Sequence, residues 1–217
     1  MTSLNNLLEA SASYHHHLCP RQVLGVRMGM WAGELLDLEL PRNDKRLLAL
    51  VETDGCAVDG IAVATGCWIG RRTLRIIDFG KVAATFVDIE TRRAVRIVPQ
   101  LASRERAWLY ATEASTRWQA QLLGYQRMPV NELLRAQSVS LTFSLEKLLS
   151  KDGYRVTCQM CGEEIINERE VEQDGRILCR ACAGQRYYAL TEEPQETVCL
   201  SRHETGNLML LETIPAI

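Results

Sequence analysis

The sequence predicts an α+β fold, in which a core of mixed helices and strands is followed by a small four-cysteine finger. Helix-period and strand-like apolar runs succeed one another up to about residue 150. Half of the eight cysteines, with many carboxylates, then gather in residues 158–182. A chain of 217 residues that is 47% hydrophobic can bury one sizeable core and a smaller module. We therefore expect a core domain over residues 1–150 and a finger domain over residues 154–217.

Three helices are expected in the first part of the core. One covers residues 3–13, and the second runs from Pro20, at its first position, to about Asp37. The third covers residues 56–65, with Gly66 as its C-terminal cap.

A row of glycines marks the second of these helices. Gly25, Gly29 and Gly33 recur every four residues and so lie on one line of the helix. Each costs about 0.5–1 kcal/mol relative to alanine. The row predicts that another backbone passes close by, either in the same chain or in a second subunit.

Strands and further helices complete the core. Four strands are expected, over residues 47–52, 73–78, 83–89 and 94–98. Residues 103–123 predict the longest helix, because Trp108, Ala111, Ser115, Trp118 and Leu122 recur at helical spacing. Pro129 opens a short helix or turn, and residues 141–149 fit either a strand or a helix.

The finger is predicted from cysteine spacing. Two Cys-x-x-Cys pairs, separated by 17 residues, are formed by Cys158, Cys161, Cys179 and Cys182. Four thiolates close a tetrahedral zinc site, which is therefore structural. Iron can use the same ligands, and redox dithiols are the metal-free alternative. A treble-clef or zinc-ribbon type of finger is expected, with a strand over residues 176–178 and a helix from Cys182.

The charge of the finger bears on its partner. Residues 158–198 hold four Arg, no Lys, eight Glu and one Asp, which is a net charge of −5. The whole chain carries −2. Such a surface repels phosphates, so we expect a protein partner rather than nucleic acid.

The sequence also predicts a cytoplasmic protein with no membrane contact. No apolar run approaches about 18 residues, and the first 20 residues contain no Lys or Arg.

A second constellation lies in the N-terminal half. His17 and Cys19 are two residues apart, so both side chains point the same way in an extended backbone. Cys56 begins a predicted helix, where the dipole favours a thiolate. Together the three would form an open metal site with room for water or substrate.

Further residues belong to this hypothesis. His15 and Cys67 are additional candidate ligands, while Asp54 and Asp59 would orient ligands. The alternative is that the cysteines, Cys67 above all, are buried core residues.

Cys199 and His203 are interpreted as incidental, because two residues without partners close no coordination sphere.

These motifs resemble the FmdE family, the E-type component of formylmethanofuran dehydrogenase, over nearly the whole chain. The matching segments are His15-His16-His17-Leu18-Cys19-Pro20, Asp54-Gly55-Cys56-Ala57-Val58-Asp59, Thr65-Gly66-Cys67-Trp68-Ile69-Gly70 and Asp78-Phe79-Gly80-Lys81. The resemblance implies an α+β core, often paired as a homodimer, with a cleft lined by cysteine and histidine. Many relatives also carry a four-cysteine finger.

The chain departs from the family pattern at the cleft wall. Arg21 replaces Gly, Trp68 replaces Thr, and Arg71-Arg72 replaces Lys-Gly. The added arginines favour an anionic ligand. Nothing here resembles a pterin-binding apparatus, so the family enzyme's carbon dioxide fixation is not expected of this chain.

Three functions remain open. The first is a zinc-dependent binding or accessory protein. The second is an enzyme that uses either an open metal or the Cys56 thiolate. Its candidate catalytic groups are Cys56, Asp54, Asp59 and Lys81, with Arg27 or Arg71 neutralising an anion. The third is a structural, dimeric adaptor whose finger docks a partner.

Overall fold

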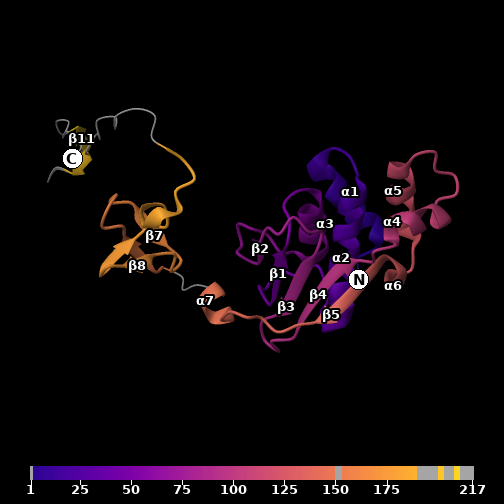
Figure 1. The fold of residues 1–217 in the computed structure, drawn as a ribbon, viewed down its shortest axis with the longest axis horizontal. Helices are drawn as coiled ribbons and strands as arrows, with labels where there is room; N and C mark the ends of the chain where they lie inside the picture. The colour runs from indigo at the N-terminus through magenta and orange to yellow at the C-terminus, as the bar shows by residue number, and fades with distance from the viewer. Residues whose placement is uncertain (1, 150–152, 190–199, 203–207, 211–217) are drawn as a thin grey trace. The chain divides into compact units, whose positions relative to one another are not determined.

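The chain divides into two units, Met1–Leu149 and Ser150–Ile217 (Figure 1). The structure is a computed structural model that describes residues 2–149, 153–189, 200–202 and 208–210. None of the helices in these ranges is both long and apolar enough to cross a bilayer.

A five-stranded sheet organises the first unit. Its strands are β1 (Leu47–Val51), β2 (Leu74–Ile76), β3 (Ala84–Asp88), β4 (Ala94–Pro99) and β5 (Leu134–Ser138). Their order is β2-β1-β3-β4-β5, with β1 and β2 parallel and the other neighbours antiparallel. Val51 pairs with Ile76 on one side and with Ala84 on the other. The four predicted strands are confirmed, and β5 was not predicted.

Three helices precede or interrupt the strands, as predicted: α1 (Leu4–His15), α2 (Pro20–Leu36) and α3 (Cys56–Thr65). Ser3 caps α1 by accepting a hydrogen bond from the backbone of Asn6. Gly66 ends α3 in a left-handed conformation with φ of 74°.

The glycine row of α2 is explained within one chain. A Cβ atom on Gly25 would lie 2.2 Å from the carbonyl oxygen of Ala57, and one on Gly29 would lie 2.6 Å from the Cβ of Ala64. Gly60 of α3 faces α2 in the same way, because its Cβ would lie 2.3 Å from the carbonyl oxygen of Gln22. The close neighbour is α3 at Gly25 and Gly29 and the chain at Leu38 and Leu40 at Gly33, so the row is explained without a second subunit.

The predicted long helix over residues 103–123 is wrong. The segment forms α4 (Ser103–Arg106), the 3₁₀ turn η1 (Ala107–Tyr110) and α5 (Arg117–Arg127). Thr116 begins α5 afresh, because its side chain accepts from the backbone of Gln119. Hydroxyl side chains compete with a continuous helix in this way.

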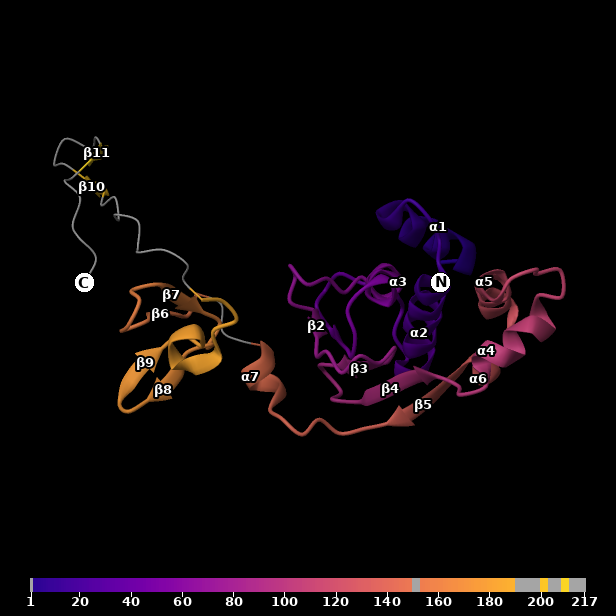
Figure 2. The same cartoon turned by 45° about the horizontal axis from the view of Figure 1, so that its top comes forward.

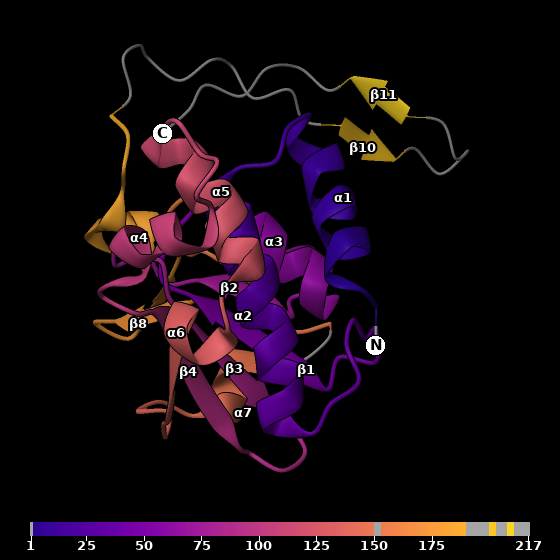
Figure 3. The same ribbon diagram turned by 90° about the vertical axis from the view of Figure 1, so that its right-hand side faces the viewer.

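Short helices α6 (Val130–Leu133) and α7 (Leu145–Leu149) follow. Residues 145–149 of the ambiguous segment are therefore helical. Figure 3 shows α5 beside α2.

The two faces of the sheet are covered differently (Figure 2). Helices α2 and α3 pack on one face, where Phe86 and Ile97 are fully buried. The other face, with Leu48 and Leu50, packs against Leu145 and the chain that leads into α7. The main core thus holds α2 and α3 in place against the sheet.

The second unit contains short hairpins. Strand β6 (Arg155–Thr157) pairs with β7 (Glu164–Ile166), β8 (Val171–Gln173) pairs with β9 (Arg176–Leu178), and β10 (Leu200–Arg202) pairs with β11 (Leu208–Leu210). The predicted strand over residues 176–178 is confirmed. The helix expected from Cys182 is only a turn, η2 (Ala181–Gln185), because Gly184 has φ of 94°.

Candidate metal centres

The four cysteines of the second unit converge on one point. The sulfur atoms of Cys158, Cys161, Cys179 and Cys182 all lie within 4.8 Å of one another. The Cys161 and Cys179 sulfurs are 3.9 Å apart. Zinc–sulfur bonds of about 2.3 Å give a tetrahedron with edges of about 3.8 Å. The sulfur cage therefore fits a zinc ion.

Tight turns position these sulfurs. Gly162, with φ of 74°, reverses the chain after Cys161, and its amide donates to the carbonyl oxygen of Cys158 over 2.9 Å. The second knuckle begins at the end of β9, where the Cys179 amide donates to the Cys158 sulfur over 3.2 Å. The described residues buried beside this knuckle are Cys158, Ile165 and Leu178. So small a core relies on metal for much of its folding free energy.

The thiols of the cage differ in acidity. Backbone amides of Cys161 and Cys179 lower the pKa of Cys158 to about 6. The hydrogen bond with the Cys179 sulfur, together with burial, raises the pKa of Cys182 to about 12. Four thiolates so close together need a positive charge between them, and a divalent cation provides it.

The N-terminal constellation brings two cysteines together. Cys19 is the N-cap of α2, and Cys56 is the first residue of α3. The two helices run in the same direction and pack through Gly25 and Gly60, so their N-termini lie at the same end. The Cys19 and Cys56 thiols lie close enough for one to act on the pKa of the other.

Cys56 is not the activated thiolate that its helix position predicted. Burial raises its pKa, and the Cys19 thiol raises it further, while Arg21 acts in the opposite direction. The helix N-terminus is present as predicted, but partial burial beside a second sulfur outweighs it.

The other predicted ligands do not lie as close together as the four cysteines of the finger. Among the described side chains, only the four finger cysteines form a metal-sized group of three or more. His17 therefore does not join Cys19 and Cys56 in one tight triad. Asp59 lies one turn along α3 from Cys56, and Asp54 is exposed just before the helix. The side chain of His15, like Cys199 and His203, lies outside the described residues.

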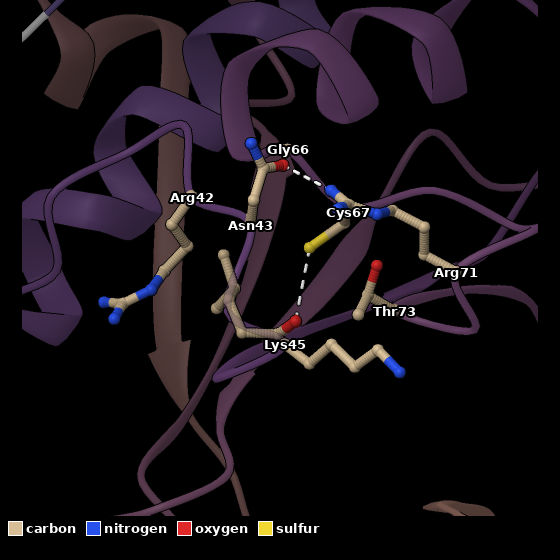
Figure 4. Close-up of a pocket in the computed structure, with 8 residues that line it drawn as sticks. Arg42, Asn43, Lys45, Gly66, Cys67, Arg71 and Thr73 are labelled. Carbon is tan, nitrogen blue, oxygen red and sulfur yellow. Dashed lines mark hydrogen bonds between the residues drawn. The ribbon is translucent and has the colours of Figure 1, made fainter.

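Cys67 lies at the other end of α3 from Cys56. Ten helical residues separate them by about 15 Å, so one chain does not bring Cys67 to the cysteine pair. The Cys67 thiol, labelled in Figure 4, donates to the carbonyl oxygen of Leu47 over 3.3 Å. The residue is 2% exposed, and burial raises its pKa. It is the buried core cysteine of the alternative interpretation.

The predicted cations have other partners. Arg27 donates to the carbonyl oxygens of Tyr125, Gln126 and Met128, so it fastens the end of α5. Arg71 hydrogen bonds to Asn43 near Cys67 (Figure 4). Lys81 lies in an exposed loop, 5.8 Å from the ring of Phe79.

One further feature of the first unit was not predicted from sequence. Arg21, Arg104 and Arg117 line a single cavity although they come from three separate segments. Such a cluster has no spacing signature, because the fold alone assembles it.

Comparison with known proteins supports both units. The profile of the family described as "FmdE, Molybdenum formylmethanofuran dehydrogenase operon" matches residues 14–141. That of the "Prokaryotic dksA/traR C4-type zinc finger" matches residues 153–188. The sulfur cage is therefore a structural zinc site.

Two individual proteins are similar to this chain. A probable S-adenosyl-L-methionine-binding protein of Archaeoglobus fulgidus is 31% identical over 212 residues, which are 87% of this chain. The match spans only 55% of that protein. The crystal structure of a tungsten formylmethanofuran dehydrogenase FmdE-like protein from Syntrophus aciditrophicus has the same fold. Its TM-score is 0.57 at 23% identity, covering 87% of this chain and 96% of that one.

Proposed function

This chain belongs to the FmdE family, and on that premise we propose that it is a binding or accessory protein with two metal centres. The zinc ion of the finger stabilises the fold of the second unit. A second divalent metal binds at Cys19 and Cys56, with His17 as the third ligand and one position open to a small molecule.

The observation that carries the second centre is the placement of Cys19 and Cys56 at the N-termini of two helices whose backbones touch. Two thiols at the N-termini of two packed helices make half of a tetrahedral site. His17 is two residues from Cys19, in the exposed connection between α1 and α2. Burial keeps Cys56 protonated as a thiol, so metal binding there would release a proton.

A binding role is better supported than a role in chemistry. The curated relative is named for binding S-adenosyl-L-methionine, which makes that compound a ligand to test on this chain. For the enzyme alternative, Asp59 is the better-placed base, because it lies one turn from Cys56. A metal with an open position would supply Lewis acidity there.

The experiment is a metal count on purified full-length protein. We expect two metal ions per chain in the wild type and one in Cys56→Ser and Cys19→Ser. Cys67→Ala is the matched control, because Cys67 is a buried cysteine at the far end of α3, and it should keep both ions. Cys161→Ser should lose the finger zinc alone.

One ion per chain in the wild type, removed by Cys161→Ser and not by Cys56→Ser, would contradict the second centre. The function would then reduce to the adaptor alternative, in which the finger is the only metal site.

A further inference from the structure

A cavity of about 430 Å³ lies where the start of α2 meets α4 and α5. Arg21 of α2, Arg104 of α4 and Arg117 of α5 contribute guanidinium groups to its lining. Glu105 is the only carboxylate among the described residues that line it, so the lining carries a net positive charge. A concave site with this balance favours an anion.

The three arginines are not engaged elsewhere. No described carboxylate forms an ion pair with any of them, although nearby arginines are paired. Arg106 contacts Glu132 over 3.2 Å, and Arg127 contacts Glu113 over 2.7 Å. The cavity therefore holds the arginines of this region that remain available to a ligand.

The floor of the cavity is built differently from its rim. Tyr125 and Ser103 are each 2% exposed. Leu24 and Pro20 add buried apolar surface, and Val82 is half-buried. A ligand that fits both parts has negative oxygens at one end and an apolar body at the other.

The cavity begins next to Cys19 along the chain. Pro20 and Arg21 line it, and they directly follow Cys19, the N-cap of α2.

We propose that this cavity binds a small organic dianion, whose oxygens are held by Arg21, Arg104 and Arg117. Phosphate monoesters and dicarboxylates share this chemistry. The arginines and the floor are complete without a metal, so the proposal goes beyond the two-metal function and does not depend on it.

The test is titration calorimetry on the full-length, zinc-loaded protein, with inorganic phosphate and succinate as separate probes. At least one probe should bind, and Arg104→Gln and Arg117→Gln should each weaken it about tenfold, since each removes a charge-assisted hydrogen bond. Arg135→Gln is the control, because Arg135 is exposed in β5 and does not line the cavity. It should bind like the wild type, and added salt should weaken binding.

The two probes distinguish a phosphate ligand from a dicarboxylate. The proposal is overturned if neither binds, or if Arg104→Gln and Arg117→Gln bind as tightly as Arg135→Gln. Thermal melts of each variant show that the unit is folded. If the protein holds two metal ions but binds neither anion, this proposal is wrong and the proposed function stands. If it binds an anion but holds one metal ion, the proposed function is wrong and this proposal stands.

Discussion

At the scale of single residues, glycine contacts decide where the cysteine pair lies. Gly25 and Gly60 let the backbones of α2 and α3 touch, and this contact places Cys19 beside Cys56. A side chain at either glycine would have to separate the helices, because the atoms it meets are backbone atoms.

We expect Gly25→Ala to lower the free energy of unfolding by about 1–3 kcal/mol, as overpacked cores do. Chemical denaturation measures the loss. Gly70→Ala is the matched control, because a Cβ there meets nothing within 4 Å, and its effect should stay within about 0.5 kcal/mol. Equal stability of the two variants would contradict the close approach of α2 and α3.

Asp88 provides a pH-dependent prediction. Its carboxylate is fully buried and accepts from Arg46 over 2.8 and 2.9 Å and from Thr91 over 2.8 Å. The Arg46 guanidinium holds the pKa of Asp88 well below its usual range, and Thr91 lowers it further. The folded pKa is therefore below the unfolded value of about 3.9. The stabilisation is complete above that value and is lost as the pH falls toward the folded pKa.

We expect Asp88→Asn to be less stable than the wild type at pH 7 and to lose less stability between about pH 4 and pH 2. Urea titrations at several pH values measure both effects. Asp54→Asn, at an exposed carboxylate in the same unit, should follow the wild-type pH dependence. An unchanged acid slope in Asp88→Asn would show that the Arg46 pair is not formed in solution.

At the scale of elements, the finger and the core depend on different forces. The core buries whole helices against a sheet, whereas the finger's small core at the second knuckle has three buried residues in the part of the chain that the structure describes. Metal ligation therefore supplies much of the folding free energy of the finger, whereas apolar burial supplies that of the core.

We expect a strong chelator to unfold residues 153–189 and leave residues 2–149 folded. Amide resonances measured by NMR would report each unit separately. Zinc should restore the lost signals, while magnesium, which prefers oxygen ligands, should not. Persistence of the finger signals in metal-free protein would contradict a zinc-dependent fold.

At the scale of the whole molecule, charge and apolar surface are unevenly distributed. The acidic region over residues 158–198 has a net charge of −5 in a chain whose total is −2. Four large apolar side chains are exposed on the segments around α4 and α5: Leu101, Trp108, Leu109 and Trp118. Exposed apolar groups on neighbouring elements mark interaction surfaces.

We propose that this apolar face joins two copies of the chain, as the family resemblance implied. Light scattering should give twice the 24.5 kDa mass of one chain at micromolar concentration. The double variant Leu109→Asp with Trp118→Asp should be monomeric and folded. Tyr187→Asp, at an exposed aromatic residue of the second unit, should remain dimeric. A monomeric wild type would refute the dimer.

Local chemistry allowed much of the molecule to be predicted from sequence. Helices α1, α2 and α3 and the first four strands follow from caps, glycine stops and apolar periodicity. The finger follows from cysteine spacing, because ligands with two residues between them converge through the geometry of one turn.

Tertiary structure decided everything that depends on distant contacts. Strand β5 forms because β4 offers it an edge, and the residues before α5 break a helix that their spacing favoured. Cys67 was separated from Cys56 by the length of α3, and three distant arginines were assembled around one cavity. The physical reason is the distance along the chain over which each interaction acts. Caps, turns and ligand spacing involve residues a few positions apart, so the sequence shows them directly. Tertiary packing joins segments that are far apart in the sequence, and no local pattern predicts which segments will meet.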